Sequence, residues 1–178
     1  GNGTVAFTID FFDLAGNQGT QATAILSGSN VTFDKTAPGT NSITVASSNG
    51  TSTLAKNGDV ITVTVVAAED LQTNDALSPY GIASASIAGQ NISGGNISST
   101  SATNWEISYT MNGEESDGSA SYAFTMADAT GNTTDISSAG SAVTIDNTKP
   151  TLTLVSLASN NADASYAKQD DVITLTIT

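Results

Sequence analysis

The sequence predicts an all-β protein made of tandem β-sandwich repeats. Three observations lead to this prediction. Of the 178 residues, 38% are hydrophobic and only 12% are charged, a balance that in a chain rich in Thr, Val and Ile favours strands. Apolar and polar residues alternate with a period of two over short segments, and several segments recur at a nearly constant spacing.

The recurring segments set the length of the repeat. They are turn-like or strand-like, and they occur in the same order near both ends of the chain. The offset is about 112 residues between 34–38 and 146–150 and between 56–64 and 168–176, and slightly larger between 13–17 and 128–132. We therefore expect the C-terminal part of one repeat over 1–33, a complete repeat over 34–145 and the N-terminal part of a third over 146–178, as a window on a longer array.

Period-two alternation predicts six strands in the complete repeat, each with one buried face. The expected strands are 42–46, 59–67, 81–88, 105–111, 119–126 and 139–145, with a weak strand or only loop over 89–103. The expected core consists of Ile43, Val45, Ile61, Val63, Val65, Ala85, Ile87, Trp105, Ile107, Tyr109, Tyr122, Phe124, Met126, Val143 and Ile145. About seven short strands in about 110 residues favour an immunoglobulin-like sandwich, with a barrel as the alternative.

The recurring motifs resemble a known family. An Asp-x-Thr-x-Pro linker opens each unit, Asn57–Thr64 reads Asn-Gly-Asp-Val-Ile-Thr-Val-Thr, and an Asp-x-x-Gly-Asn turn precedes the last strand. Together they resemble the bacterial Ig-like tandem repeats of giant, RTX-like adhesins secreted by the type I pathway. The resemblance implies an extracellular stalk on the cell surface, with Ca²⁺ at the junctions. Its partners would be neighbouring repeats of the same chain, and other domains would contact a host or surface ligand.

Composition excludes several other functions. The chain has 4 Lys and Arg against 17 Asp and Glu, a formal net charge of −13, and no His or Cys. It cannot form a Ser-His-Asp or Cys-His nucleophile, a zinc site of nitrogen and sulfur ligands, or a disulfide, so we expect no enzyme. The negative charge disfavours nucleic acid and anionic membranes, and no apolar run reaches the length of a membrane span.

Strand direction predicts where the carboxylates gather. If successive strands alternate in direction, the linker, the loop after 59–67 and the turn at 128–132 share one edge of the sandwich. That edge would collect the oxygen donors of Asp34, Glu69, Asp70, Asp128 and Asn132, with Asp75 as a further candidate. Clustered carboxylates repel one another unless a hard cation binds them, and oxygen donors alone favour Ca²⁺.

Each residue of this group also has a purely structural interpretation. Asp128–Asn132 is a good hairpin turn, Asp34 suits an Asx turn before Pro38, and the Glu69–Asp70 pair suits a solvated loop. A second acidic group at the opposite edge is expected to be solvated; it comprises Asp59, Glu114, Glu115, Asp117 and Asp146. For function, a self-assembling filament or sheath subunit and a glycan-binding or protein-binding Ig-like module remain alternatives to the stalk.

Overall fold

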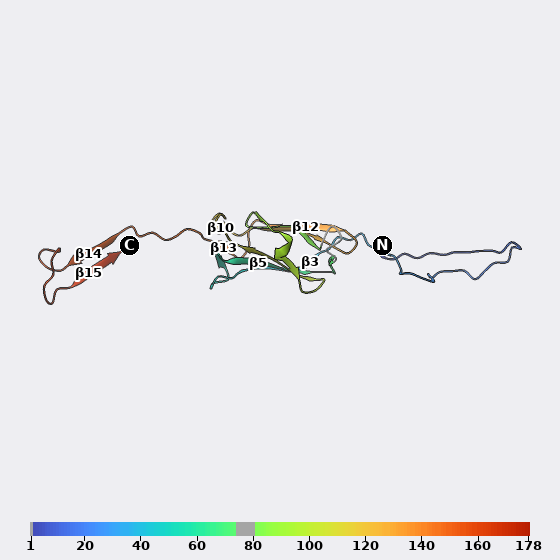
Figure 1. The fold of residues 1–178 in the computed structure, drawn as a ribbon, viewed down its shortest axis with the longest axis horizontal. Helices are drawn as coiled ribbons and strands as arrows, with labels where there is room; N and C mark the ends of the chain where they lie inside the picture. The colour runs from blue at the N-terminus through green and yellow to red at the C-terminus, as the bar shows by residue number, and fades with distance from the viewer. Residues whose placement is uncertain (1, 74–80) are drawn as a thin grey trace. The chain divides into compact units, whose positions relative to one another are not determined.

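The computed structural model describes residues 2–73 and 81–178 (Figure 1). Throughout this described part the regular structure is strand, apart from one 3₁₀ turn at Gly94–Asn96, so the all-β prediction is confirmed. The chain forms two compact units that divide between Asn147 and Thr148. No helix in the described ranges has the length and hydropathy to cross a membrane.

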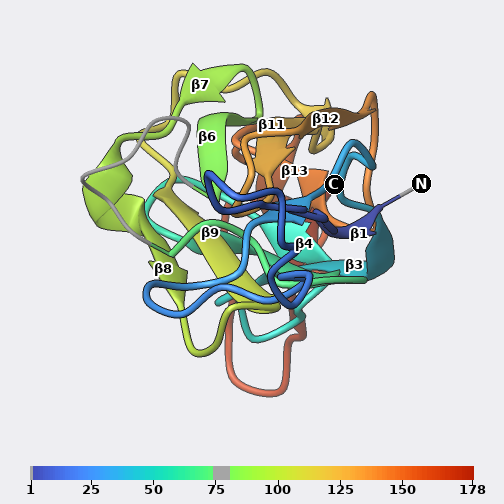
Figure 2. The same ribbon diagram turned by 90° about the vertical axis from the view of Figure 1, so that its right-hand side faces the viewer.

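Two four-stranded sheets enclose the core of the first unit, as in a β-sandwich. Figure 2, which looks along the strands, shows β6, β11 and β12 in one layer and β3, β8 and β9 in the other. The first sheet has the order β3 (Thr40–Ser47), β5 (Val60–Ala67), β9 (Asn104–Thr110) and β8 (Ile97–Ser99). The second sheet has the order β12 (Thr133–Ser138), β11 (Tyr122–Ala127), β6 (Ile82–Ile87) and β7 (Gln90–Asn91).

A small third sheet lies at the end of the sandwich opposite the predicted metal site. It consists of β10 (Gly118–Ser119), β13 (Thr144–Ile145) and β4 (Leu54–Ala55). The β13·β4 pair is parallel. Because β10 pairs with β13 whereas β11 pairs with β6 and β12, the single strand predicted over 119–126 is two strands in different sheets.

The last strand was also predicted in the wrong place. The chain is already a strand at Thr133–Ser138, directly after the turn, and of the predicted segment 139–145 only Thr144–Ile145 is a strand. Ile136 is the one large apolar residue of β12, and it packs on the core from a half-buried position. An edge strand with a single inward apolar residue shows too little alternation to be predicted.

The predicted core lies between the two main sheets. Its residues are buried, except Ile43, Val45, Tyr109 and Tyr122, which are half-buried and pack against it. Trp105 is 1% exposed and donates its indole N–H to the carbonyl of Ala102 at 3.0 Å. In the described part of the chain, the buried apolar residues that alternation did not indicate include Ala55, Ala67, Leu71, Ile82, Met111, Ala120 and Ala127.

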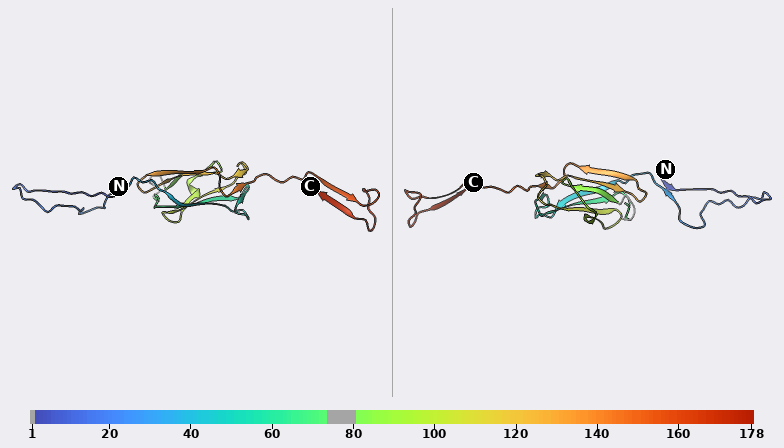
Figure 3. Two further views of the ribbon diagram at one scale, coloured as in Figure 1. Left: turned by 180° about the vertical axis from the view of Figure 1, so that it is seen from behind. Right: turned by 45° about the horizontal axis from the view of Figure 1, so that its top comes forward.

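Short strand pairs outside the sandwich repeat its registers. In the second unit, β14 (Val155–Ser159) pairs with β15 (Ile173–Ile177), seen as two antiparallel arrows in Figure 3. Every residue pair of this ladder lies one repeat length after a pair of β3·β5. Likewise β1 (Gly3–Thr4) and β2 (Thr32–Phe33) pair in the register of β10 and β13.

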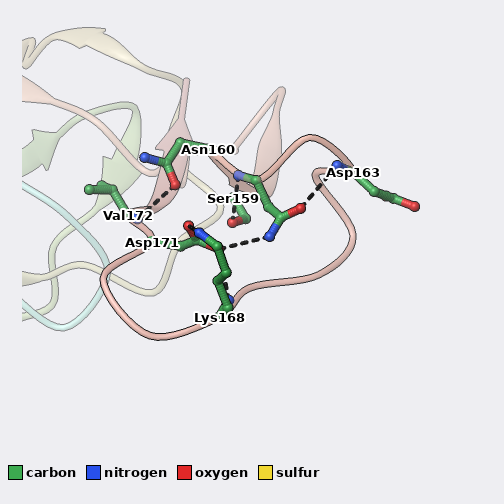
Figure 4. Close-up of polar contacts among 7 residues, drawn as sticks. Ser159, Asn160, Asp163, Lys168, Asp171 and Val172 are labelled. Atoms are coloured by element: carbon green, nitrogen blue, oxygen red, sulfur yellow. Dashed lines mark hydrogen bonds and ion pairs between the residues drawn. The ribbon is translucent and has the colours of Figure 1, made fainter.

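Turns repeat with the same hydrogen bonds. Figure 4 shows Asp171 accepting from the backbone and side chain of Lys168, and Asn161 donates to the same carboxylate at 2.9 Å. Asn49 and Asp59 lie one repeat length before Asn161 and Asp171, and Asn49 donates to Asp59 in the same way at 2.8 Å. The connections of β3 to β5 and of β14 to β15 therefore contain the same hydrogen-bonded turn at equivalent positions of the repeat.

Candidate metal site

Three carboxylates meet at the edge of the sandwich where the chain enters it. One carboxylate oxygen from each of Asp34, Glu69 and Asp128 lies within 4.8 Å of the others. Asp34 precedes β3, Glu69 follows β5 and Asp128 follows β11. Residues far apart in the sequence therefore share one site, which the antiparallel order of the strands makes possible.

Asp128 is the most rigidly held of the three. It is 3% exposed and begins the turn that joins β11 to β12. Its Oδ1 accepts from the backbone N–H groups of Thr130 and Asn132 at 2.8 and 2.9 Å, and its Oδ2 accepts from the Asn132 amide at 2.8 Å. Gly131 closes the turn at φ +91°, a conformation that favours glycine.

The pKa of Asp128 reflects these contacts. Burial opposes ionisation, but the hydrogen bonds from Asn132 and Thr130 outweigh it and hold the pKa below its usual range. The carboxylate is therefore kept charged at neutral pH, and its hydrogen bonds fix its orientation. The same hydrogen bonds surround Asp13 in the earlier turn, with Ala15 and Asn17 as donors.

Glu69 is placed beside Asp128 by the backbone that follows it. Leu71, two residues later, forms a β-bridge with Asp128 and is 2% exposed. Gln72 donates its N–H to the carbonyl of Ala127 at 2.9 Å. Burial raises the pKa of Glu69, and the charges of Asp34 and Asp128 raise it further. The raised pKa of Glu69 thus reflects its burial and the repulsion among the three carboxylates.

Asp34 connects the site to the preceding segment. Its Oδ1 accepts from the N–H of Thr36 at 2.9 Å, which is an Asx turn, and from the side-chain amide of Asn2. Its backbone carbonyl accepts from the Asn132 amide at 3.3 Å. The linker aspartate is therefore both a turn residue and a member of the acidic cluster.

The remaining predicted ligands have different positions. Asn132 donates its side-chain N–H groups to Asp128 and to the Asp34 carbonyl, so it braces the carboxylates. Asp70 is exposed and does not belong to the group of three. Asp75 lies outside the described residues. Asn132 was identified because of the turn motif; its contact with Asp128 is made within the turn, whereas its contact with the Asp34 carbonyl depends on the tertiary fold.

The acidic group at the opposite edge is not uniformly solvated. Glu115 is 5% exposed and accepts from the hydroxyl of Tyr109 and from the N–H groups of Asn112 and Gly113 at 3.1 and 3.0 Å. Burial alone would raise its pKa, but these hydrogen bonds hold the pKa below the usual range. The expectation of solvation is wrong for Glu115, because the sequence Glu-Glu-Ser-Asp does not show which carboxylate turns inward.

Comparison of the chain with family models, with curated proteins and with solved structures finds no match. Three carboxylates, of which that of Asp128 belongs to a residue only 3% exposed, offer oxygen donors and no nitrogen or sulfur. Such a donor set suits a hard divalent cation, which would also remove the repulsion at Glu69.

Proposed function

We propose that Asp34, Glu69 and Asp128 bind Ca²⁺ at the junction between two repeats. The observation that carries this proposal is the convergence of three carboxylate oxygens within 4.8 Å from three separate segments. Ca²⁺ takes six to eight oxygens, so backbone carbonyls and water would complete its shell. Asn132 keeps Asp128 in place, and Asp34 belongs to the linker itself, so the ion would tie the linker to the sandwich.

We further propose that the chain is built from Ig-like repeats of about 112 residues. The support comes from two independent ladders: β14·β15 has the register of β3·β5, and β1·β2 has that of β10·β13. The Asp13 and Asp128 turns agree in their hydrogen bonds as well. Such repeats in tandem, tied by ions at their junctions, suit a structural stalk module of a bacterial cell-surface adhesin, which takes part in adhesion and biofilm formation.

An extracellular location follows from this proposal. Oxygen sites assembled from a few carboxylates on extracellular modules bind Ca²⁺ with dissociation constants of roughly 10⁻⁴–10⁻³ M. A site of that affinity is filled where calcium is abundant, outside the cell. The strongly acidic surface, with a net charge of −13, would attract the cation to the chain.

Calcium titration tests the site directly. Isothermal titration of the chain with Ca²⁺ should show binding that Glu69→Gln weakens at least about tenfold, which is about 1.4 kcal/mol. Glu106→Gln is the matched control, because it removes the same charge from an exposed position on β9. Equal affinities of the two variants would contradict the assignment, as would the absence of any Ca²⁺-dependent signal.

Solution scattering tests the mechanical part of the proposal. With Ca²⁺ the junction at Asp34 should stiffen, so the maximum dimension should change when a chelator is added. Glu106→Gln should respond as the wild type does, whereas Glu69→Gln should need about tenfold more Ca²⁺ for the same response. An unchanged maximum dimension in the wild type would argue against a calcium-stiffened stalk.

One feature favours the alternative of a self-assembling filament or sheath subunit. Apolar side chains of residues 2–33 and 148–178 are exposed, among them Phe12 at 61%, Leu26 at 104% and Leu157 at 69%. Apolar strand faces of this kind can pair between molecules. Polymerisation that rises with protein concentration, followed by light scattering, would support the filament over the stalk.

A further inference from the structure

Asn147, the residue that follows the second linker aspartate, makes three hydrogen bonds to other parts of the first unit. The N–H of Asn147 donates to Asp117 Oδ1 at 2.7 Å, and its side-chain amide donates to the Glu115 carbonyl at 3.0 Å. Its Oδ1 accepts from the N–H of Asn57 at 2.8 Å. One half-buried side chain thus joins the turn before β5 to the loop after β9.

The loop that receives Asn147 is itself braced. Glu115 is buried and ties the hydroxyl of Tyr109 to the N–H groups of Asn112 and Gly113. The carbonyl that Asn147 contacts belongs to this same Glu115. Loop 112–117 is therefore held by its own hydrogen bonds, and it contacts Asn147 directly through protein donors and acceptors.

The first junction has the corresponding backbone contact. Lys35 lies one repeat length before Asn147, and its N–H donates to Asn2 Oδ1 at 3.2 Å. Asn2 and Asp117 are equivalent too, because Asn2 directly precedes β1 as Asp117 directly precedes β10. An Asn oxygen and an Asp oxygen thus hold equivalent backbone N–H groups, so the contact depends on the acceptor oxygen and not on its charge.

We propose that each junction carries an ion-independent latch, in which the preceding repeat holds the residue directly after the linker aspartate. The assignment of this latch to repeats depends on the proposed function, whereas its hydrogen bonds do not. At the first junction Asp34 lies with Glu69 and Asp128, while Lys35 is held by Asn2. Asn2 therefore contacts both residues, and Asn132 contacts Asp34 from the sandwich, so consecutive linker residues are hydrogen-bonded to both sides of the junction.

Amide exchange and backbone order parameters measured on the whole chain test the latch. The amide of Asn147 should be protected, with an order parameter near the rigid value of about 0.85, in Ca²⁺ and in chelator alike. Asp117→Ala should accelerate its exchange about tenfold or more, because the acceptor oxygen is lost. Asp117→Asn is the matched control: it places at 117 the residue type found at position 2, so exchange should stay within about threefold of the wild type.

Asn147→Ala provides a second variant, in which the amide of Asn57 should lose protection while the amides of β5 keep theirs. Fast exchange at Asn147 in the wild type, protection that appears only with Ca²⁺, or equal exchange in the two Asp117 variants would overturn the latch. Failure of the proposed function has a different signature. In that case titration shows no Ca²⁺ binding while Asn147 stays protected.

Discussion

The surroundings of Asp128 and Glu69 shift the pKa values of these two carboxylates in opposite directions. Hydrogen bonds from Asn132 and Thr130 lower the pKa of Asp128, whereas burial and two neighbouring charges raise that of Glu69. Ionised Asp128 stabilises the fold, and this contribution is lost as the pH falls through its lowered pKa. Ionised Glu69 destabilises the fold, so the ion-free protein gains stability as the pH falls through the raised pKa of Glu69.

The effect of Glu69→Gln on the free energy of unfolding should therefore change sign when Ca²⁺ is added. In chelator, the free energy of unfolding of the variant should be up to about 1 kcal/mol higher than that of the wild type, because a repelling charge is gone. At a Ca²⁺ concentration about 100 times the wild-type dissociation constant, the wild type should gain about 2.7 kcal/mol, whereas a variant that binds about tenfold more weakly should gain only about 1.4 kcal/mol. Urea unfolding with and without Ca²⁺ measures both values. Glu106→Gln, the exposed control, should follow the wild type in both buffers.

The Tyr109 hydroxyl stabilises the buried Glu115 carboxylate. Tyr109→Phe should lower the free energy of unfolding by about 1.5–3 kcal/mol, since the hydrogen bond is made to a charged group. Burial and Glu115 raise the pKa of Tyr109 to about 12. This contribution is complete below pH about 10 and is lost as the pH rises through about 12.

A pH series of unfolding experiments checks the Tyr109 prediction. The variant should lose less stability than the wild type between pH about 10 and 12. Tyr122→Phe is the control, because its ring keeps the stacking on Phe124 at 6.2 Å between centroids. If both variants had the same alkaline profile, the hydrogen bond to Glu115 would not carry this stability.

At the scale of elements, the loop that carries Glu69 depends on close packing at Gly81. A Cβ at this position would lie 2.6 Å from both the Gln72 carbonyl oxygen and the Trp105 ring. Gly81→Ala should therefore destabilise the fold by about 1–3 kcal/mol, the usual cost of overpacking. Thermal unfolding measures this loss, and it should be accompanied by weaker Ca²⁺ binding.

Gly50→Ala is the matched control for Gly81. A Cβ at Gly50 meets nothing within 4 Å, so the substitution should stay within about 0.5 kcal/mol of the wild type. Equal stability of the two variants would mean that the loop moves away from Trp105 at little cost. The site would then be more adaptable than the packing indicates.

At the scale of the whole molecule, burial differs between the parts of the chain. Ile61, Val63 and Val65 on β5 are 0% exposed, whereas Ile173, Leu175 and Ile177, the equivalent residues of β15, are 56–60% exposed. The ladder is the same, but no second layer covers β14·β15 within the part of the chain that the structure describes.

Amide exchange should be slower in the buried strands of the sandwich than in the exposed ladder β14·β15. The β5 and β9 amides should open only by global unfolding, whereas the β14·β15 amides should exchange at least about a hundredfold faster, because a two-stranded ladder is marginal alone. Exchange monitored by NMR distinguishes the two. Equal protection would mean that another surface covers β14·β15 in solution.

Local patterns were enough to predict most of the strands, the core and the segments that supply Asp34, Glu69 and Asp128, because alternation and spacing can be read along the chain. They did not reveal β12, whose single inward residue gives no pattern, or the burial of Glu115. Which donors meet depends on the folded chain: the bridge of Leu71 to Asp128 draws Glu69 inward and leaves Asp70 exposed. Neighbouring carboxylates of the same chemistry differ in burial through the contacts that the folded chain makes around each of them.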